Sequence, residues 1–164
     1  DGTHLKVNQT SLWPVGAEGA GAAGNFGGLC YSGKGDVVVA RGNTGGAGGG
    51  QISWNPFTKR VIPVATALLA GYNYKTGELV WLVEHDSANV ANGVTCGNGF
   101  AFTAKPTTGE MLAYDVNTGH LKSRLKYTGT SAYNDAEMIT NGASAFLVST
   151  KSVQRFTYKP NFGM

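Results

Sequence analysis

The sequence predicts an all-β protein built from antiparallel, four-stranded propeller-type blades. The motif Tyr72–Trp81 (YNYKTGELVW) returns 42 positions further on as Tyr114–Ser123 (YDVNTGHLKS). A repeat of about 40–45 residues is typical of a propeller blade. Short apolar runs alternate with Gly, Asn and Pro turns, as in antiparallel strands. These observations together predict about three blades in an incomplete ring.

Composition narrows the class of protein further. The chain has 164 residues, of which 14% are charged and 41% are hydrophobic, so it can bury a core. The 13 basic residues are scattered and the net charge is only +3, which does not favour nucleic-acid binding. No apolar run reaches the roughly 18 residues of a membrane helix, so no membrane span is expected.

The distribution of glycine, which accounts for 25 of the 164 residues, predicts how the chain divides into domains. Residues 1–50 are expected to be a Gly-rich arm with one or two strands, including a hairpin over Leu29–Ala40 and a loop over Arg41–Gly50. Gly19–Gly24 fits the string GxGxxG, but strand-like residues follow it. A dinucleotide site needs a helix there, so that function is not favoured. The start at Asp1, without Met, is typical of a processed or recombinant product.

Residues 51–164 are expected to hold the blades. Each pair of strands is joined by a short turn rich in Gly, Asn or Thr, where Gly adopts positive φ readily. The expected segments are a hairpin at Ile52–Val64, strands at Gly71–Tyr74, Glu78–Glu84, Gly93–Cys96, Phe100–Ala104, Glu110–Tyr114, His120–Lys126, Ala136–Thr140 and Ala145–Ser149, and a last strand at Val153–Tyr158.

Cysteine usage leaves two alternatives open. Cys30 and Cys96 are 66 positions apart and fit either one disulfide in an oxidising compartment or two separate buried thiols. Neither lies in a CxxC motif or beside a His, so metal binding is not expected. Asn8-Gln9-Thr10 is an N-glycosylation sequon, which makes Asn8 a candidate for that modification.

The repeated motifs resemble the blades of quinoprotein dehydrogenases, the PQQ-dependent alcohol and sugar dehydrogenases. Their blades end in a strand of the type A-x-D-x-x-T-G-x-x-x-W. SWNPFTKRVIPV and VTCGNGFAFTA resemble two further hairpins of the family. The resemblance covers roughly residues 50–149 and corresponds to the C-terminal blades of such an enzyme. It implies that the Thr-Gly turns and the Trp dock neighbouring blades; the residues concerned are Thr76, Gly77, Trp81, Thr118 and Gly119.

The same resemblance bears on cofactors. The family uses PQQ and calcium, with a general-base Asp and calcium ligands on blades N-terminal to the matched region. Asn89–Asn92 replaces a Trp-Gly-Gly-Thr run that contacts the quinone in the family, and Ser123 replaces the second docking Trp. No cofactor is therefore expected in this chain alone. PQQ and calcium are expected only if other blades complete the ring. We expect no catalytic residue here, and whether the whole protein is an enzyme stays uncertain.

Two clusters of titratable residues are candidates for a site. Glu84-His85-Asp86 fits either a base, His85, oriented by a carboxylate, or a strand end that turns into solvent. Asp135 and Glu137 lie two apart and share one face of a strand, which fits a calcium or acid–base pair, or else a position at the rim. His4, His85 and His120 are too far apart in sequence for a metal motif.

The function favoured by the sequence is therefore that of a segment of a secreted quinoprotein dehydrogenase-like β-propeller. The alternative is a non-catalytic, self-assembling extracellular subunit that completes its sheets with a neighbouring chain. In both cases the expected partners are other protein chains or copies of this chain. The expected location is extracellular or periplasmic.

Overall fold

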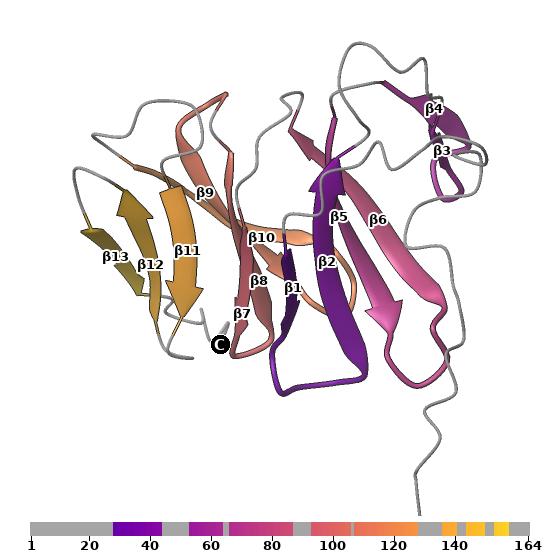
Figure 1. The fold of residues 1–164 in the computed structure, drawn as a ribbon, viewed down its shortest axis with the longest axis horizontal. Helices are drawn as coiled ribbons and strands as arrows, with labels where there is room; N and C mark the ends of the chain where they lie inside the picture. Colours follow the sequence, from indigo (N-terminus) through magenta and orange to yellow (C-terminus); the bar gives the residue numbers. More distant parts are fainter. Residues whose placement is uncertain are drawn as a thin grey trace, which may run out of the picture.

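The computed structural model describes residues 28–43, 53–63, 66–86, 93–105, 107–127, 136–140, 144–149 and 153–157. These residues form strands and turns (Figure 1). Within them, no helix is long and apolar enough to cross a membrane. The predicted all-β class is therefore confirmed for the described part of the chain.

Two sheets have the four strands of a propeller blade, all antiparallel. Sheet 1 has the order β1-β2-β5-β6, and sheet 2 has the order β7-β8-β9-β10. The strands of sheet 1 are β1 (Gly28–Tyr31), β2 (Val37–Asn43), β5 (Ala67–Asn73) and β6 (Leu79–Asp86). Those of sheet 2 are β7 (Val94–Gly97), β8 (Phe100–Lys105), β9 (Glu110–Asp115) and β10 (Leu121–Lys126).

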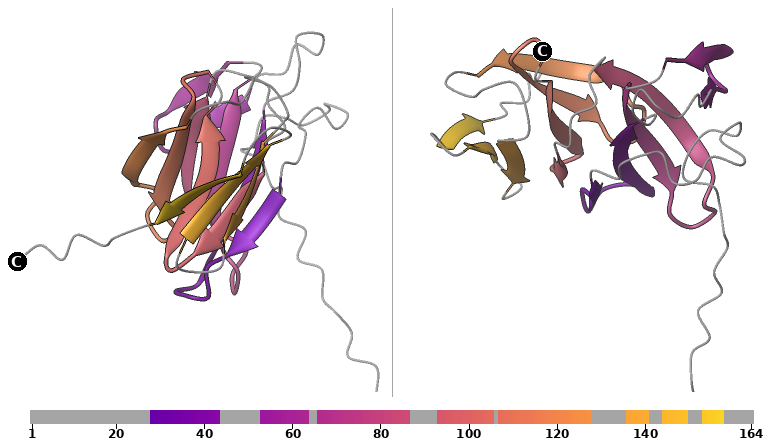
Figure 2. Two further views of the ribbon diagram at one scale, coloured as in Figure 1. Left: turned by 90° about the vertical axis from the view of Figure 1, so that its left-hand side faces the viewer. Right: turned by 45° about the horizontal axis from the view of Figure 1, so that its top comes forward.

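Sheet 3 has three strands in the described residues, in the order β11-β12-β13. They are β11 (Ala136–Thr140), β12 (Ser144–Ser149) and β13 (Val153–Thr157). Figure 2 shows the three sheets arranged in a row, with neighbouring sheets facing each other. This arrangement of antiparallel sheets confirms the predicted propeller-type blades.

The predicted hairpin at Ile52–Val64 is present but does not join a blade. Its strands are β3 (Ser53–Asn55) and β4 (Arg60–Ile62), which pair only with each other among the described strands. The hairpin lies in sequence between β2 and β5, which are adjacent in sheet 1. It is thus an insertion in the second connection of the blade. The predicted division at residue 50 falls inside sheet 1, with two strands of the sheet on each side.

The predicted loop at Arg41–Gly50 is wrong for its first three residues. Arg41, Gly42 and Asn43 continue β2 and pair with β5. Because side chains alternate along a strand, Arg41 lies on the same face as Val37 and Val39. The many glycines of this segment favoured a loop in the sequence-based prediction. The pairing with β5 is what extends β2 through these three residues.

The 42-residue repeat is also a repeat of strand register. Gly71 pairs with Trp81 and Tyr72 with Leu79, so Val80 is an extra residue that forms a bulge. In sheet 2, Ala113 pairs with Ser123 and Tyr114 with Leu121, so the extra residue is Lys122. Each of these positions lies 42 residues after its counterpart. The two sheets therefore share their bulges as well as their sequence motif.

The turns before the outer strands are built alike. The side-chain oxygen of Asn73 accepts hydrogen bonds from the backbone N–H groups of Lys75 and Thr76, at 2.9 and 3.1 Å. Asp115 accepts from Asn117 and Thr118 at 3.0 and 3.1 Å. The hairpin turn repeats the pattern, since Asn55 accepts from residues 57 and 58. A short side-chain acceptor at the first turn position thus organises each turn.

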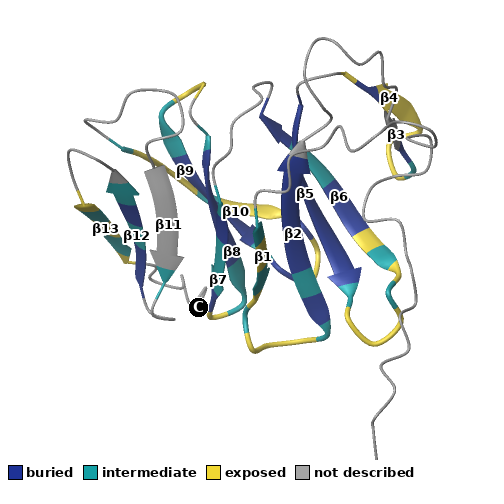
Figure 3. Ribbon diagram, viewed as in Figure 1, coloured by how far each residue is buried: buried dark blue, intermediate teal, exposed yellow. Residues whose placement is uncertain are grey.

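Three apolar clusters hold the sheets together. One joins sheets 1 and 2 and includes Val39, Leu69, Trp81, Leu112 and Val116. A second joins sheets 2 and 3 through residues such as Phe102 and Leu147. The third lies on the other face of sheet 1, where Ile62 of the hairpin packs with residues of β2, β5 and β6. Figure 3 shows the buried residues concentrated on the middle strands of the sheets.

The turn geometry predicts the effect of changing Asp115. Asp115→Ala removes the acceptor for two backbone N–H groups and should lower the free energy of unfolding by about 1–2 kcal/mol. Asp115→Asn should be close to neutral, because Asn73 and Asn55 perform the same role in this chain. Urea unfolding at neutral pH measures both changes. A loss in Asp115→Asn as large as that in Asp115→Ala would contradict this role.

Candidate functional site

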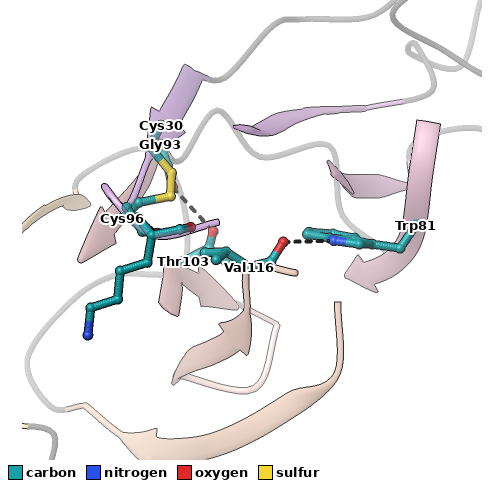
Figure 4. Close-up of a disulfide and its surroundings, with 8 residues drawn as sticks. Cys30, Trp81, Gly93, Cys96, Thr103 and Val116 are labelled. Atoms are coloured by element: carbon teal, nitrogen blue, oxygen red, sulfur yellow. Dashed lines mark hydrogen bonds between the residues drawn. A yellow bond between two sulfur atoms is a disulfide. The ribbon is translucent and has the colours of Figure 1, made fainter. Parts of the chain in front are cut away.

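Trp81 is the central contact between sheets 1 and 2. Its side chain is 6% exposed, and Nε1 donates a 2.9 Å hydrogen bond to the carbonyl oxygen of Val116 (Figure 4). The ring lies against Gly71 of its own sheet and Gly119 of the next sheet, and a Cβ at either position would collide with the ring. The indole therefore fills a slot that exists only because both residues are glycine.

The other docking candidates lie in the two Thr-Gly turns. Gly77 and Gly119 both have positive φ, 76° and 70°. The hydroxyl oxygens of Thr76 and Thr118 each accept a hydrogen bond from the backbone two residues on, at 3.3 Å. Thr76 and Thr118 are exposed, whereas Gly119 is buried. The structure thus brings Trp81 and Gly119 together across the interface, and the two threonines support their own turns.

The second copy of the motif lacks the Trp and also lacks its slot. Ser123 occupies the position of Trp81, and Ala113 occupies that of Gly71, in the same cross-strand pair. A Cβ at this pairing position would collide with an indole, as it would at Gly71. The apolar cluster between sheets 2 and 3 therefore replaces the indole-based contact.

Cys30 and Cys96 form a disulfide with an S–S distance of 2.05 Å and a Cα–Cα distance of 5.4 Å. It joins β1 to β7, the first strands of sheets 1 and 2. Figure 4 shows the disulfide and Trp81 at separate points of the same interface. Nearby, Lys34 Nζ donates a 2.6 Å hydrogen bond to Asn98 Oδ1 between the first turns of the two sheets. Of the two alternatives for the cysteines, the structure has the bridged pair.

A polar cleft opens where the ends of several strands meet the hairpin. Its volume is about 510 Å³. The lining residues come from β4, β6, the end of β8 and the segments that follow β4 and β8: Arg60, Pro63, Thr66, Glu84, His85, Asp86, Lys105, Thr107 and Thr108. The Glu84-His85-Asp86 cluster therefore lines a cleft that it shares with five other polar or charged side chains.

The prediction that the Glu84–Asp86 strand end turns into solvent is wrong. His85 and Asp86 are each only 4% exposed. The physical reason is a bulge: Leu68 pairs with Glu84 and Ala67 with Asp86, which leaves His85 as the extra residue. The bulge breaks the simple alternation along the strand, so two consecutive side chains are buried.

The alternative reading, in which a carboxylate orients His85 as a base, also differs from the structure. Neither ring nitrogen of His85 has a hydrogen-bond partner among the described residues. Burial lowers the pKa of His85 to about 3, and the charges of Arg41 and Lys105 lower it in the same direction. His85 is therefore neutral near pH 7 and a weak base.

The carboxylates of the cleft already have partners. Thr107 Oγ1 donates a 2.6 Å hydrogen bond to Asp86 Oδ1. Glu84 forms an ion pair with Arg60 at 2.7 Å and accepts a 3.2 Å hydrogen bond from Asn55 Nδ2. Glu84 thus anchors the hairpin to β6. Both carboxylates hold the walls of the cleft together.

Arg41 was missed by sequence reasoning. Its side chain is fully buried, and this burial lowers its pKa to about 10, while the charge of Asp86 acts in the opposite direction. The signal that could have revealed it is the alternation of Val37, Val39 and Arg41 on one face of β2.

Most of the remaining candidates fall outside the part of the chain that the structure describes. Asn8, Gly19–Gly24, Asn89–Asn92 and Asp135 lie outside the described residues, as does His4, and the side chain of Glu137 is not described either. His120 is exposed in its turn. Among the described residues, no three His, Cys, Asp or Glu side chains come together in a way that could hold a metal ion.

No known family model matches the chain. No curated protein matches its sequence. Among solved structures, the chain is similar to BamB from Moraxella catarrhalis, a β-propeller protein, with a TM-score of 0.53 and 12% identity. The alignment covers 80% of this chain and 33% of BamB, so the chain spans about a third of that protein. At this identity the likeness shows the fold alone, and it agrees with the predicted propeller-type sheets.

Two designed proteins are also similar in structure. The computationally designed Ika4 protein has a TM-score of 0.47 and 10% identity, covering 82% of this chain and 92% of its own. The computationally designed Ika8 protein has a TM-score of 0.43 and 10% identity, covering 81% and 46%.

The Trp81 slot predicts a large effect of Gly119→Ala. The new Cβ would lie 2.6 Å from Cδ2 of the indole, at a residue whose φ is 70°. Left-handed strain and overpacking together should lower the free energy of unfolding by about 2–4 kcal/mol. Gly109→Ala is the matched control, because φ there is 65° and the Cβ would meet nothing within 4 Å. It should lose only about 1 kcal/mol. Equal losses in urea unfolding would show that contact with Trp81 is unimportant.

The buried His85 predicts that acid destabilises the fold. Its pKa is about 3 in the folded chain and about 6.5 when unfolded. The unfolded state therefore binds one more proton between these values, and stability falls as pH drops below about 6.5. From pH 6 to pH 4, the wild type should lose roughly 1 kcal/mol more per pH unit than His85→Leu. Urea unfolding across this range measures the difference, and parallel curves would contradict it.

Proposed function

We propose that this chain is a segment of a secreted, quinoprotein-like β-propeller and that it supplies blades without supplying reacting groups. The observation that carries the proposal is the interface between sheets 1 and 2. There Trp81 enters the glycine slot at a position set by the repeated motif. In the quinoproteins that the sequence resembles, the corresponding Trp docks neighbouring blades.

The proposed location is extracellular or periplasmic. The Cys30–Cys96 disulfide supports it, because disulfides form and persist mainly in oxidising compartments. The bridge joins the first strands of two successive sheets, so it strengthens the same interface as Trp81. The disulfide that supports an oxidising location is thus also part of the interface between the first two sheets.

The two carboxylates of the cleft do not fit a calcium site. Calcium in proteins takes six to eight oxygen ligands, with several carboxylates among them. The two carboxylates of the cleft are engaged by Arg60, Asn55 and Thr107, and no third acidic side chain joins them among the described residues. We therefore derive no step through calcium or PQQ, and the proposal assigns the groups that would hold them to other blades.

A second candidate is a self-assembling extracellular subunit. It is favoured by β13, which pairs only with β12 among the described strands. Val153 on this strand is 66% exposed. An open strand edge is a template for pairing with another chain. In this case the partner would be a copy of the same chain.

The proposal predicts the behaviour of the chain in two compartments. Exported to the periplasm of a bacterial host, it should show no thiol that an alkylating reagent can label, and it should resist protease. Made in a reducing cytosol, it should label at Cys30 and Cys96 and be degraded faster. With PQQ, calcium and an electron-accepting dye, the exported chain should oxidise alcohols no faster than the reagents alone.

Each arm has a result that would overturn part of the proposal. Equal protease resistance of the reduced and oxidised chains would remove the argument for secretion. Alcohol oxidation by this chain alone would show that it carries reacting groups. Native mass spectrometry separates the two candidates, because a series of regular oligomers of the purified chain favours the self-assembling subunit.

A further inference from the structure

The polar cleft has the size of a small-molecule site. Binding pockets for small ligands have volumes of about 300–1,000 Å³, and this cleft has about 510 Å³. Its walls come from sheet 1, sheet 2 and the inserted hairpin. The Glu84–Arg60 ion pair holds the hairpin side, and the Asp86–Thr107 hydrogen bond joins the two sheets. The cleft is therefore a built feature of the fold.

His85 is the group in this cleft that the fold leaves unsatisfied. It lines the cleft and is 4% exposed, yet neither ring nitrogen has a hydrogen-bond partner among the described residues. An unsatisfied buried polar group costs about 1–3 kcal/mol, and such groups in native proteins call for an explanation. A ligand that takes a hydrogen bond from the imidazole N–H supplies that explanation.

The charges around His85 leave one cation available. Among the described residues, Lys105 has no ion-pair partner within 4.0 Å, whereas Arg60 is paired with Glu84. Glu110, opposite Lys105 across the β8–β9 pair, accepts a hydrogen bond from Thr108 Oγ1. This bond, followed by the charges of Arg124, Lys126 and Lys105, lowers the pKa of Glu110. The Lys105 charge is close enough to act on His85. Lys105 and His85 thus both line the cleft, and each carries a hydrogen-bond donor.

We propose that the cleft binds a small organic acid, with one carboxylate held between the Lys105 ammonium group and the His85 ring. The cleft favours a single negative charge. Among the lining residues, the cations Arg60 and Lys105 balance the anions Glu84 and Asp86, and His85 is neutral. Arg41 does not line the cleft, but its positive charge acts on His85 and on Asp86. A ligand with one negative charge therefore meets less repulsion here than a dianion does. A phosphate dianion would leave excess negative charge beside Glu84 and Asp86. A cationic ligand would be repelled by the charge of Lys105.

Nuclear magnetic resonance of the histidine rings tests this proposal. The ¹⁵N-labelled full chain is titrated with lactate at constant ionic strength, with chloride as the reference salt. The His85 ring signals, assigned by their loss in His85→Gln, should shift in a saturable way. Lys105→Gln should weaken lactate binding at least tenfold. Lys122→Gln removes the same charge from an exposed position on β10 outside the cleft, and it should bind as the wild type does.

A second variant separates binding from a purely structural role. His85→Leu removes the unsatisfied nitrogens, so it should keep or raise the urea midpoint while losing lactate binding, followed through the backbone amides of Thr107 and Thr108. Retained binding in His85→Leu would overturn the proposal. So would an equal effect of Lys122→Gln and Lys105→Gln, tighter binding of inorganic phosphate than of lactate, or the absence of a saturable shift at tens of millimolar lactate. None of these outcomes depends on the compartment or on the number of blades in the ring.

Discussion

The indole of Trp81 inserted between two glycines is the constraint on which the relation of sheets 1 and 2 depends. Large aromatic side chains dominate the energetics of such packing because they bury so much surface. Here the ring is positioned by a hydrogen bond to Val116 and by the absence of a Cβ at Gly71 and Gly119. Geometry, and not just apolar area, therefore sets how closely the two sheets approach. The disulfide then secures an alignment that the indole slot defines.

The cleft lies beside a local irregularity in the same strand. β6 carries two bulges, one at Val80 and one at His85. The first recurs in sheet 2 at Lys122 and belongs to the blade pattern. The second, near the end of the strand, turns His85 into the space bounded by the hairpin and by the β8–β9 turn. A bulge is a common means of redirecting a side chain next to a functional site.

Much of the fold could be predicted because its determinants are local. Alternating residues and Asn or Asp turn acceptors lie within a few positions of each other, so the hairpins from Glu110 to Lys126 follow from the sequence. The contact of the Trp81 indole with the next sheet could be expected from the resemblance of the motif to quinoprotein blades. The burial of His85 was not, because a bulge depends on pairing with β5. The burial of Arg41 was hidden by its glycine neighbours, and the separate position of the β3–β4 hairpin depends on contacts with Glu84 from a distant strand.

The disulfide has a further consequence for the covalent topology of the chain. It closes a loop between Cys30 and Cys96, a separation of 66 residues. This loop contains most of sheet 1 and the whole inserted hairpin. A single backbone cut anywhere inside this loop creates a new C-terminus and a new N-terminus. It releases no fragment, because the disulfide still joins the two pieces. Residues on both sides of such a cut remain covalently joined through the bridge, so the two pieces can re-associate as parts of one molecule.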